Sequence, residues 1–384
     1  MKQIYLDHNA TTKIHDDVAA AMADCFRSGY VNPASQHASG RAARAVLEQA
    51  RETIADILDA RTAPHAHDQV IFTSGGTEAN NLALFGLAGQ SRGRIIVSAI
   101  EHPSILAAAV RLAQLGYDVQ HLRVSSDGVC DLAHFNDLLT EETKLVSVML
   151  ANNETGVIQP VKEIAEICFG KNIPFHCDAV QAVGKIPVSF RELNSAAMTI
   201  APHKFHGPCG IGILLVRHRV TLQPLMFGGA QQFGLRPGTE CVAASVGAAK
   251  ALEIYRDDLD RQQRMETLRA RLESRIRAEI PDCVIVGEQS HRLPHTTNLA
   301  FRGVDRQAFL MAIDMAGVAI STGSACASGS SEPSHVLIAM NCDSEVINGS
   351  LRISLGALTT VEEIDLAAGH IIRTAKDLCA RRSS

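Results

Sequence analysis

Short apolar runs alternate with helical stretches from about residue 38 to residue 300, and this alternation constrains the fold more than any other feature. The runs at residues 95–99, 145–150 and 211–216 are nearly apolar throughout. Strands buried on both faces of a parallel sheet have this composition, and the helices between them would be crossover connections. We therefore predict an α/β fold whose large domain, at residues 16–259, contains a mostly parallel sheet flanked by helices.

The last third of the chain has a different pattern. A long helical stretch at residues 239–277 leads out of the large domain. Helices then alternate with strand-like runs at residues 297–301, 318–321 and 351–354. We predict that residues 1–15 and 260–384 form a smaller α+β domain. The apolar segment at residues 4–6 could pair with a strand of either domain.

The composition excludes several classes of protein. A chain of 384 residues with 46% hydrophobic content can bury one large core or two moderate ones. Its net charge of −5 provides no broad basic surface for a nucleic-acid backbone, so we expect no direct nucleic-acid partner. We find neither a secretory signal nor an apolar run long enough to cross a bilayer, so we expect a cytoplasmic protein without a membrane partner.

The ten cysteines are scattered, and no two of them form a Cys-x-x-Cys pair. Cys168, Cys177 and Cys241 stand in apolar surroundings, and we interpret them as small core residues. Cys326 is the exception because it lies in Ser-Ala-Cys-Ala-Ser-Gly, a mobile and accessible kind of sequence that suits a reactive thiol. No spacing of His, Cys and acidic residues indicates a resident metal.

A Gly-rich turn, Ser-Gly-Gly-Thr-Glu at residues 74–78, ends one predicted strand and begins a helix. The backbone amides of Gly76 and Thr77 would point at an anion at that helix N-terminus, such as a phosphate. An ordinary turn between a strand and a helix has the same composition, so the pattern by itself leaves both interpretations open. It matches neither a P-loop nor a dinucleotide-binding motif.

Polar side chains follow several other predicted strands. His102 follows one strand, Asn153 the next, and Asp178 and Gln181 a third. The carboxyl ends of such strands meet at one edge of the sheet, where open α/β sheets bind ligands. A carboxylate there could keep a ring nitrogen protonated, an amide could bond a ring hydroxyl, and an imidazole could stack on a flat cofactor. Taken singly, Asp178 could be a helix N-cap and His102 an ordinary loop residue.

Lys204 follows a short apolar strand and stands among Gly and Pro residues. A lysine that is held still and partly desolvated favours the neutral amine needed for a Schiff base. Together with the accessible thiol of Cys326, such an amine indicates a pyridoxal phosphate enzyme that moves sulfur.

These segments resemble the cysteine desulfurases of the NifS/IscS type, which are fold type I enzymes within the class V aminotransferases. The likeness runs from about residue 3 to residue 375. Its motifs include Phe-Thr-Ser-Gly-Gly-Thr-Glu at 72–78, Asn-Asn-Glu-Thr-Gly at 152–156, Asp-Ala-Val-Gln-Ala-Val-Gly-Lys at 178–185, His-Lys at 203–204, Arg-Pro-Gly-Thr at 236–239 and Ser-Ala-Cys at 324–326. The resemblance implies a seven-stranded, mostly parallel sheet in the large domain and a mobile loop carrying Cys326 in the small one.

The resemblance also implies a role for individual residues. Lys204 would bind pyridoxal 5'-phosphate covalently, with His102 stacked on the ring as a proton donor or acceptor. Arg352 would hold the substrate carboxylate in a bidentate pair, near Asn153, and Cys326 would receive the sulfur. The other cofactor contacts would come from Gly76, Thr77, Asn153, Asp178, Gln181, His203 and, from the second subunit of a homodimer with a shared active site, Thr239.

A cysteine desulfurase converts L-cysteine to L-alanine, leaves a persulfide on an enzyme cysteine and passes the sulfur to an acceptor protein. The resemblance implies this activity, with an acceptor in iron–sulfur cluster, thio-cofactor or tRNA biosynthesis, such as an iron–sulfur scaffold or a tRNA-thiolation enzyme. It implies no metal other than a cluster that Cys326 ligates transiently.

Three alternatives stand beside this interpretation: a selenocysteine lyase, another class V enzyme such as a true aminotransferase, and a catalytically inactive homologue. Cys326 disfavours transamination, which needs no thiol. The joint presence of Lys204, Asp178, His102 and Arg352 disfavours the inactive homologue.

Two positions depart from the family pattern. Ala201 stands where relatives have a serine that donates to the cofactor phosphate. Its absence predicts a roughly tenfold or greater loss of cofactor affinity unless another group compensates. Cys209 stands where relatives have lysine, and we expect this second thiol to be inert.

Overall fold

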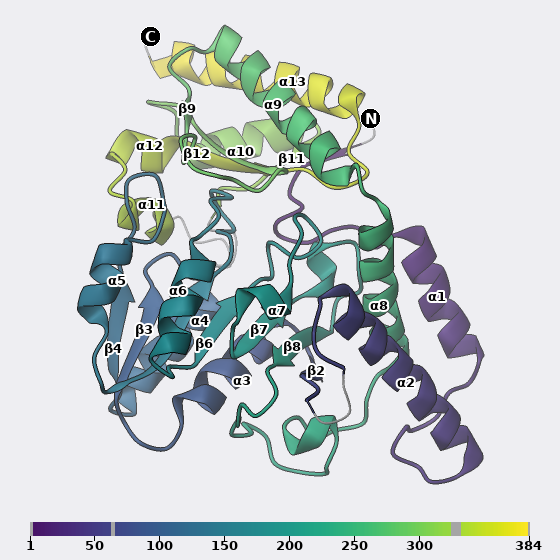
Figure 1. Cartoon of the computed structure of the whole chain (residues 1–384). Coiled ribbons are helices and arrows are strands. Elements are labelled where there is room, and N and C mark those ends of the chain that lie inside the picture. The colour runs from purple at the N-terminus through teal and green to yellow at the C-terminus, as the bar shows by residue number, and fades with distance from the viewer. Residues whose placement is uncertain (1–2, 63–65, 324–331, 383–384) are drawn as a thin grey trace.

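The computed structural model describes residues 3–62, 66–323 and 332–382, and a seven-stranded sheet lies at its centre. The strands of this sheet are β2 (Gln69–Thr73), β3 (Arg94–Ser98), β4 (Asp118–Leu122), β5 (Thr143–Met149), β6 (Phe175–Asp178), β7 (Ala197–Ile200) and β8 (Gly212–Val216). Their order across the sheet is β2-β8-β7-β6-β5-β3-β4 (Figure 1). Strand β8 runs antiparallel to both of its neighbours, and the other pairs are parallel. The predicted mostly parallel seven-stranded sheet is confirmed.

Helices cover both faces of this sheet because successive residues of a strand point to opposite sides. Ile95 and Leu145 pack on one face against α3 (Gly76–Ala88) and α4 (Pro103–Gln114). The neighbouring residues Ile96 and Val146 pack on the other face. The helices there include α2 (Ala38–Ile57), α6 (Val161–Gly170), α7 (Phe190–Leu193) and α8 (Val242–Asp257). The remaining elements of this part are α1 (Asp16–Arg27), α5 (Leu132–Leu138) and the short 3-10 helices η1 (Pro202–Lys204) and η2 (Gln232–Gly234).

A second core holds the smaller part of the molecule, which lies at the top in Figure 1. Its strands are β1 (Ile4–Tyr5), β9 (Val284–Ile285), β10 (Thr296–Ala300), β11 (Val318–Ala319) and β12 (Ser350–Ser354). Its helices are α9 (Arg261–Glu279), α10 (Arg306–Met315), α11 (His335–Ala339), α12 (Ser344–Gly349) and α13 (Val361–Arg382). Strand β1 pairs in parallel with β11, which decides between the two partners that the sequence left open. The exact domain bounds at residues 15 and 259 stay a prediction.

Three of the local predictions were wrong. The helical stretch predicted at 239–277 is two helices, α8 and α9, because Asp258 leaves the helical backbone with φ −93° and ψ 77°. Asp, which bonds its own backbone readily, is common at such helix ends. Strand β4 was missed because Asp118, Gln120 and His121 give it a polar sequence at the sheet edge.

The third wrong prediction concerns a cysteine. Cys168 and Cys177 are buried as expected, but Cys241 is exposed at the N-cap of α8. Its apolar neighbours Val242, Ala243 and Ala244 are buried, and Cys241 precedes the helix that carries them. The sequence pattern therefore located the buried segment but extended it one residue too far.

Candidate active site

Eight of the predicted site residues line one cavity of about 730 Å³ at the carboxyl edge of the seven-stranded sheet. They come from separate segments that follow β2, β3, β5, β6 and β7. These residues are Gly76, Thr77, His102, Asn153, Asp178, Gln181, His203 and Lys204. Parallel strands end at a common edge, and this explains why side chains far apart in the sequence converge there.

Lys204 ends the short 3-10 helix η1, which follows strand β7 directly. Its Nζ donates hydrogen bonds to the carbonyls of Asn9, at 2.6 Å, and Ala10, at 2.8 Å. The N-terminal segment therefore reaches the cavity and holds the amine of Lys204 in place. Neither Asn9 nor Ala10 was predicted, because a single amide or carbonyl in a short segment has no sequence pattern.

Asp178 is the last residue of β6, and its carboxylate accepts two hydrogen bonds. Asn80 Nδ2 donates to Oδ2 at 2.8 Å, and the Val180 backbone amide donates to Oδ1 at 3.0 Å. These two donors fix the orientation of the carboxylate at the edge of the sheet. Asn80 was also missed, although it lies one helical turn beyond the predicted phosphate residues at the start of α3.

His102 caps the N-terminus of α4 and belongs to the same hydrogen-bond network. Its Nδ1 accepts from the Ser104 amide at 3.1 Å and lies 2.8 Å from Ser104 Oγ, which itself accepts from Asn80 Nδ2 at 2.8 Å. Burial lowers the pKa of His102, and the charge of Asp178 partly offsets this. The ring is therefore a neutral imidazole whose proton lies on Nε2, because Nδ1 serves as an acceptor.

The N-terminus of α3 is shaped to receive an anion. Gly75 occupies its N-cap and provides no side-chain hydrogen bond, so the first amides of the helix are left for another acceptor. Thr77 and Ala201 line the cavity near this turn. His203 lines it as well; burial, with the nearby charge of Lys204, lowers the pKa of His203 to about 4.

Gln181 supplies a further indication that the cavity holds a polar group. Its Nε2 donates to the Asn9 carbonyl at 3.1 Å. Its Oε1 is buried and has no hydrogen-bond partner within the described part of the chain. Buried amide oxygens are almost always hydrogen-bonded, so this atom indicates a donor that a bound molecule would bring.

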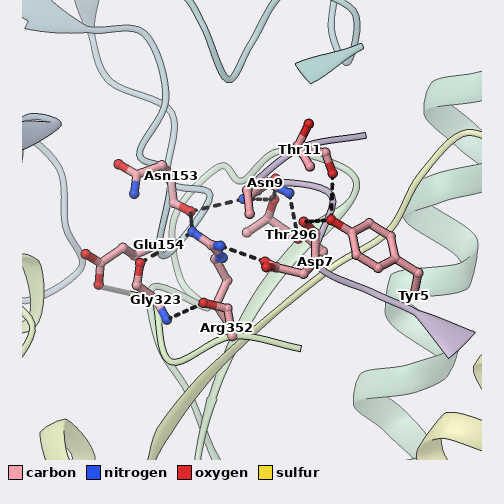
Figure 2. A network of polar contacts seen from close by, with 12 residues as sticks. Tyr5, Asp7, Asn9, Thr11, Asn153, Glu154, Thr296, Gly323 and Arg352 are labelled. Carbon is pink, nitrogen blue, oxygen red and sulfur yellow. Dashed lines mark hydrogen bonds and ion pairs between the residues drawn. The ribbon is translucent and has the colours of Figure 1, made fainter. Parts of the chain in front are cut away.

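Arg352 lies beside the cavity, on β12 of the smaller part, and is 2% exposed (Figure 2). Its Nη2 donates to Asp7 Oδ1 at 2.7 Å, and its Nη1 donates to the Asn153 carbonyl at 3.1 Å. Its Nε is buried and has no partner among the residues described. The guanidinium is thus oriented by Asp7 and Asn153 but keeps a donor for another carboxylate.

Cys326 lies outside the described residues, in the segment 324–331. Of the residues near the two ends of that segment, Gly323 bonds Arg352 and Ser334 bonds the loop after β5. The carbonyl of Gly323 accepts from Arg352 Nη1 at 3.4 Å, and Ser334 Oγ donates to Glu154 Oε2 at 2.6 Å. A hydrogen-bond path therefore joins Gly323 to Lys204 through Arg352, Asn153 and Asn9; Figure 2 shows all of it but Lys204.

Thr239 is separate from the main cavity. It lines a small cavity of about 100 Å³ together with Ser74 and Arg236. The Arg236 guanidinium pairs with Glu78 at 2.8 Å, next to the α3 N-terminus. A single chain therefore leaves Thr239 outside the site to which it was assigned, and its predicted role requires a second subunit.

Two features are missing from the described residues. No helix there is both long and apolar enough to cross a membrane. No three His, Cys, Asp or Glu side chains of that part of the chain come together in a geometry that could hold a metal ion.

The fold and the cavity together define a class of protein. A mostly parallel sheet with helices on both faces, a smaller α+β part, and a lysine near a carboxylate at the strand ends are the architecture of fold type I pyridoxal phosphate enzymes. The family model described as aminotransferase class-V matches residues 4–366. The chain belongs to this family, whose members depend on pyridoxal phosphate.

Individual relatives show which members of this family the chain resembles. The chain is 42% identical to a cysteine desulfurase of Enterobacter agglomerans, over 99% of this chain and 94% of that protein. A solved NifS-like protein is 36% identical, with a TM-score of 0.90, 98% of this chain covered and 100% of that one. The structure of SspA in complex with cysteine is 30% identical, with a TM-score of 0.80 and coverages of 93% and 99%. The predicted resemblance to the cysteine desulfurases is confirmed.

Proposed function

We propose that this protein is a pyridoxal phosphate-dependent cysteine desulfurase that converts L-cysteine to L-alanine and transfers the sulfur to Cys326 as a persulfide. The observation that carries the proposal is the hydrogen-bond path from Lys204 to Gly323, three residues before Cys326. Cys326 follows Gly323 by three residues in the sequence, and a chain of that length spans at most about 11 Å.

The residues of the cavity fit pyridoxal phosphate. The α3 N-terminus, without a side-chain cap, suits the phosphate. Asp178 suits a protonated ring nitrogen, and the unpartnered Gln181 Oε1 suits a ring hydroxyl donor. His102 also lines the cavity, and its uncharged imidazole can stack on the cofactor ring. Thr77 is the hydroxyl in the lining that could replace the serine missing at Ala201, since Ser104 is engaged with Asn80 and His102.

When bound, the cofactor supplies an electron sink that makes the Cα–H bond of the substrate acidic. Lys204 would carry the proton at Cα through its Nζ, which the carbonyls of Asn9 and Ala10 hold in place. Arg352 would hold the substrate carboxylate, using Nε and an Nη hydrogen in a bidentate pair. His102 Nε2–H would donate a proton on the side of the ring that it covers.

Cys326 would take the sulfur as a thiolate nucleophile. A bond forms between Cys326 Sγ and the substrate sulfur while the substrate C–S bond breaks. The electron pair of the broken bond stays with carbon, which becomes the methyl group of alanine after protonation. The persulfide is then passed to an acceptor protein in iron–sulfur cluster, thio-cofactor or tRNA biosynthesis.

A single incubation tests the activity. The wild-type protein, loaded with pyridoxal phosphate and given L-cysteine and a reductant, is expected to release alanine and sulfide in equal amounts. Alanine without sulfide, or pyruvate in place of alanine, would contradict the proposal. L-Selenocysteine in a parallel incubation distinguishes the lyase alternative, for which the selenium substrate would be strongly preferred.

Two variants test the roles proposed for Lys204 and Cys326. Lys204→Ala is expected to lose the covalent link that borohydride reduces, since no other lysine lines the cavity within the part of the chain described. Cys326→Ser is expected to retain cofactor absorbance and cysteine binding but to form no persulfide. The exposed Cys209 provides a matched control, and Cys209→Ser should keep full activity.

A further inference from the structure

Lys185 is a second lysine close to Lys204, and it does not line the cavity. Its side chain is 4% exposed, and its Nζ donates a hydrogen bond to the backbone carbonyl of Lys204. Within the described residues it forms no ion pair and has no other hydrogen-bond partner. A lysine that is buried for one bond to a backbone carbonyl is uncommon, because lysines are almost never buried unless paired.

The surroundings of Lys185 favour the uncharged form of its amine. Burial lowers its pKa well below the usual range, and the neighbouring Arg261 and Lys204 lower it further. A charge on Lys185 would lower the pKa of four nearby histidines, and all of them are bases: His8, His203, His206 and His295. Among the residues that the structure describes, no acidic group contributes to this shift. A neutral amine keeps its N–H groups, so the bond to the Lys204 carbonyl does not depend on charge.

The backbone next to Lys185 also touches the residue after Lys204. Gly184 has φ +80°, and a Cβ placed there would lie 2.2 Å from Phe205 Cβ. Only glycine permits both this backbone angle and this approach. The pair Gly184–Lys185 is therefore in direct contact with the pair Lys204–Phe205.

These contacts join two segments with different tasks at the cavity. Residues 178–185 begin with Asp178 and Gln181, which would hold the cofactor ring. The segment 202–205 carries Lys204, whose carbonyl accepts from Lys185. The preceding carbonyl, that of His203, accepts from the Thr12 amide at 2.9 Å and from Thr12 Oγ1 at 2.8 Å. Both of the last two carbonyls of η1 thus have a donor from elsewhere in the chain.

We propose that Lys185 is a positioning residue, which fixes the backbone of Lys204 relative to Asp178 and Gln181 through its bond to the Lys204 carbonyl. It does not touch the reacting atoms. The inference rests on the proposed function in that Lys204 must bond the cofactor. The short segment from Asp178 to Lys185 would then fix the position of the Lys204 amine relative to the residues that hold the cofactor ring.

The test compares Lys185→Met with Lys185→Gln in the full-length protein. Met and Gln have the same length, and they differ in that Gln retains an N–H donor. The kcat of Lys185→Met should fall about tenfold, the effect of losing ~1.4 kcal/mol from one hydrogen bond, while KM for cysteine stays within about twofold. Lys185→Gln should recover part of kcat. Lys171→Met, at an exposed lysine, is the control and should match the wild type.

A second readout does not need turnover. The rate at which the apoprotein develops its Schiff-base absorbance after addition of pyridoxal phosphate should fall about tenfold in Lys185→Met, with partial recovery in Lys185→Gln. If the wild type forms this band but no alanine, the proposed function fails while this rate still tests Lys185. Equal rates in all variants, Met and Gln variants that behave alike, or failure of both to fold would overturn the positioning role.

Discussion

Arg352 is held in one orientation by its neighbours and still keeps a hydrogen-bond donor for a substrate carboxylate. Asp7 and the carbonyls of Asn153 and Gly323 engage its two terminal nitrogens, and Nε remains buried without a described partner. A planar guanidinium can meet all of these acceptors at once because its donors have fixed directions. An ammonium group at the same place would satisfy fewer of them.

We therefore expect Arg352→Lys to weaken substrate binding more than chemistry. The loss of one charge-assisted hydrogen bond, worth ~1.5–3 kcal/mol, predicts a KM for L-cysteine that is roughly 10- to 150-fold higher. Cofactor absorbance should be unchanged, because Arg352 does not line the cofactor cavity. Steady-state kinetics beside Arg302→Lys, at an exposed arginine, would measure the effect; an unchanged KM would remove Arg352 from the substrate site.

Glu101 is an acid whose protonation is set by burial. Its side chain is fully buried, with Oε1 bonded to Ser98 Oγ and the Met149 amide and Oε2 without a described partner. Burial, with the nearby charge of Asp178, raises the pKa of Glu101 to about 8. The folded protein therefore holds a proton that the unfolded chain releases above pH 4.5, so Glu101 reduces stability as the pH rises from 4.5 to 8.

Glu101→Gln should remove this pH dependence, since glutamine imitates the protonated acid. The variant is expected to gain stability relative to the wild type between pH 5.5 and pH 8, by on the order of 1 kcal/mol for each pH unit. Urea unfolding at several pH values would measure the difference. Glu166→Gln, at an exposed position of α6, is the control, and a gain of the same size there would contradict the explanation.

The site residues at the strand ends were predictable from the sequence, because the sheet brings the ends of its parallel strands to one edge. Asp178, His102 and Lys204 each follow an apolar run, and parallel strands end at a common edge. Asn9 and Asn80 were not predictable in this way. Asn9 reaches the cavity from the N-terminal segment, and Asn80 lies inside a helix, so neither has a position that distinguishes it from an ordinary polar residue.

At the scale of elements, a polar chain crosses the middle of the central sheet. His176 on β6 lies between Ser147 on β5 and Thr199 on β7, and each of its ring nitrogens is 2.9 Å from one hydroxyl oxygen. Burial lowers the pKa of His176 to about 3. The folded state therefore excludes a proton that the unfolded chain binds below pH 6.5, and stability is lost as the pH falls from 6.5 toward 3.

His176→Asn should be less stable than the wild type at pH 7, by ~1–3 kcal/mol, because one of the two hydroxyls loses its partner. The difference should shrink as the pH falls from 6.5 toward 5, by up to about 1.4 kcal/mol per pH unit, since the variant has no imidazole to protonate. Thermal unfolding at pH 7, 6 and 5 would check this. The same change at exposed His121 is the control, and a difference that stays constant with pH would refute the linkage.

Elements with one consistent pattern were predicted well, and elements at a boundary were not. The apolar runs predicted at residues 95–99, 145–150 and 211–216 lie within two residues of strands β3, β5 and β8, because these strands are apolar and buried. The division of residues 239–277 into α8 and α9 was missed, since an aspartate cluster is compatible with both a helix surface and a helix end. Edge strand β4 lacks the apolar run that marks its neighbours.

The whole molecule is arranged so that residues from distant parts of the chain meet at the site. Arg352 reaches the cavity edge from the smaller part, and Asn9 reaches it from the N-terminal segment. Thr239 lines a different cavity, near the α3 N-terminus of its own chain. The family resemblance assigned Thr239 to the site of a second subunit, and the residues around it in the sequence do not indicate that role by themselves.

We therefore expect the holoenzyme to sediment as a species of twice the 41.2 kDa chain mass. Thr239→Ala should raise the Kd for pyridoxal phosphate about tenfold, because it removes a donor to the phosphate of the neighbouring site. Equilibrium dialysis beside Thr267→Ala, at an exposed threonine of α9, would measure the change. A monomeric holoenzyme, or a Thr239 variant with unchanged affinity, would exclude the shared site.

The N-terminal segment has a consequence for biosynthesis. Asn9 and Ala10 hold the amine of Lys204, while the His8 and Asn9 amides bond Ser354, near the other end of the chain. A nascent chain that has not yet emerged from the ribosome as far as β12 lacks the partner that fixes these first residues. We therefore expect the cofactor to bind only after the whole chain has been synthesised, and C-terminal truncations that remove Ser354 should accumulate as colourless apoprotein.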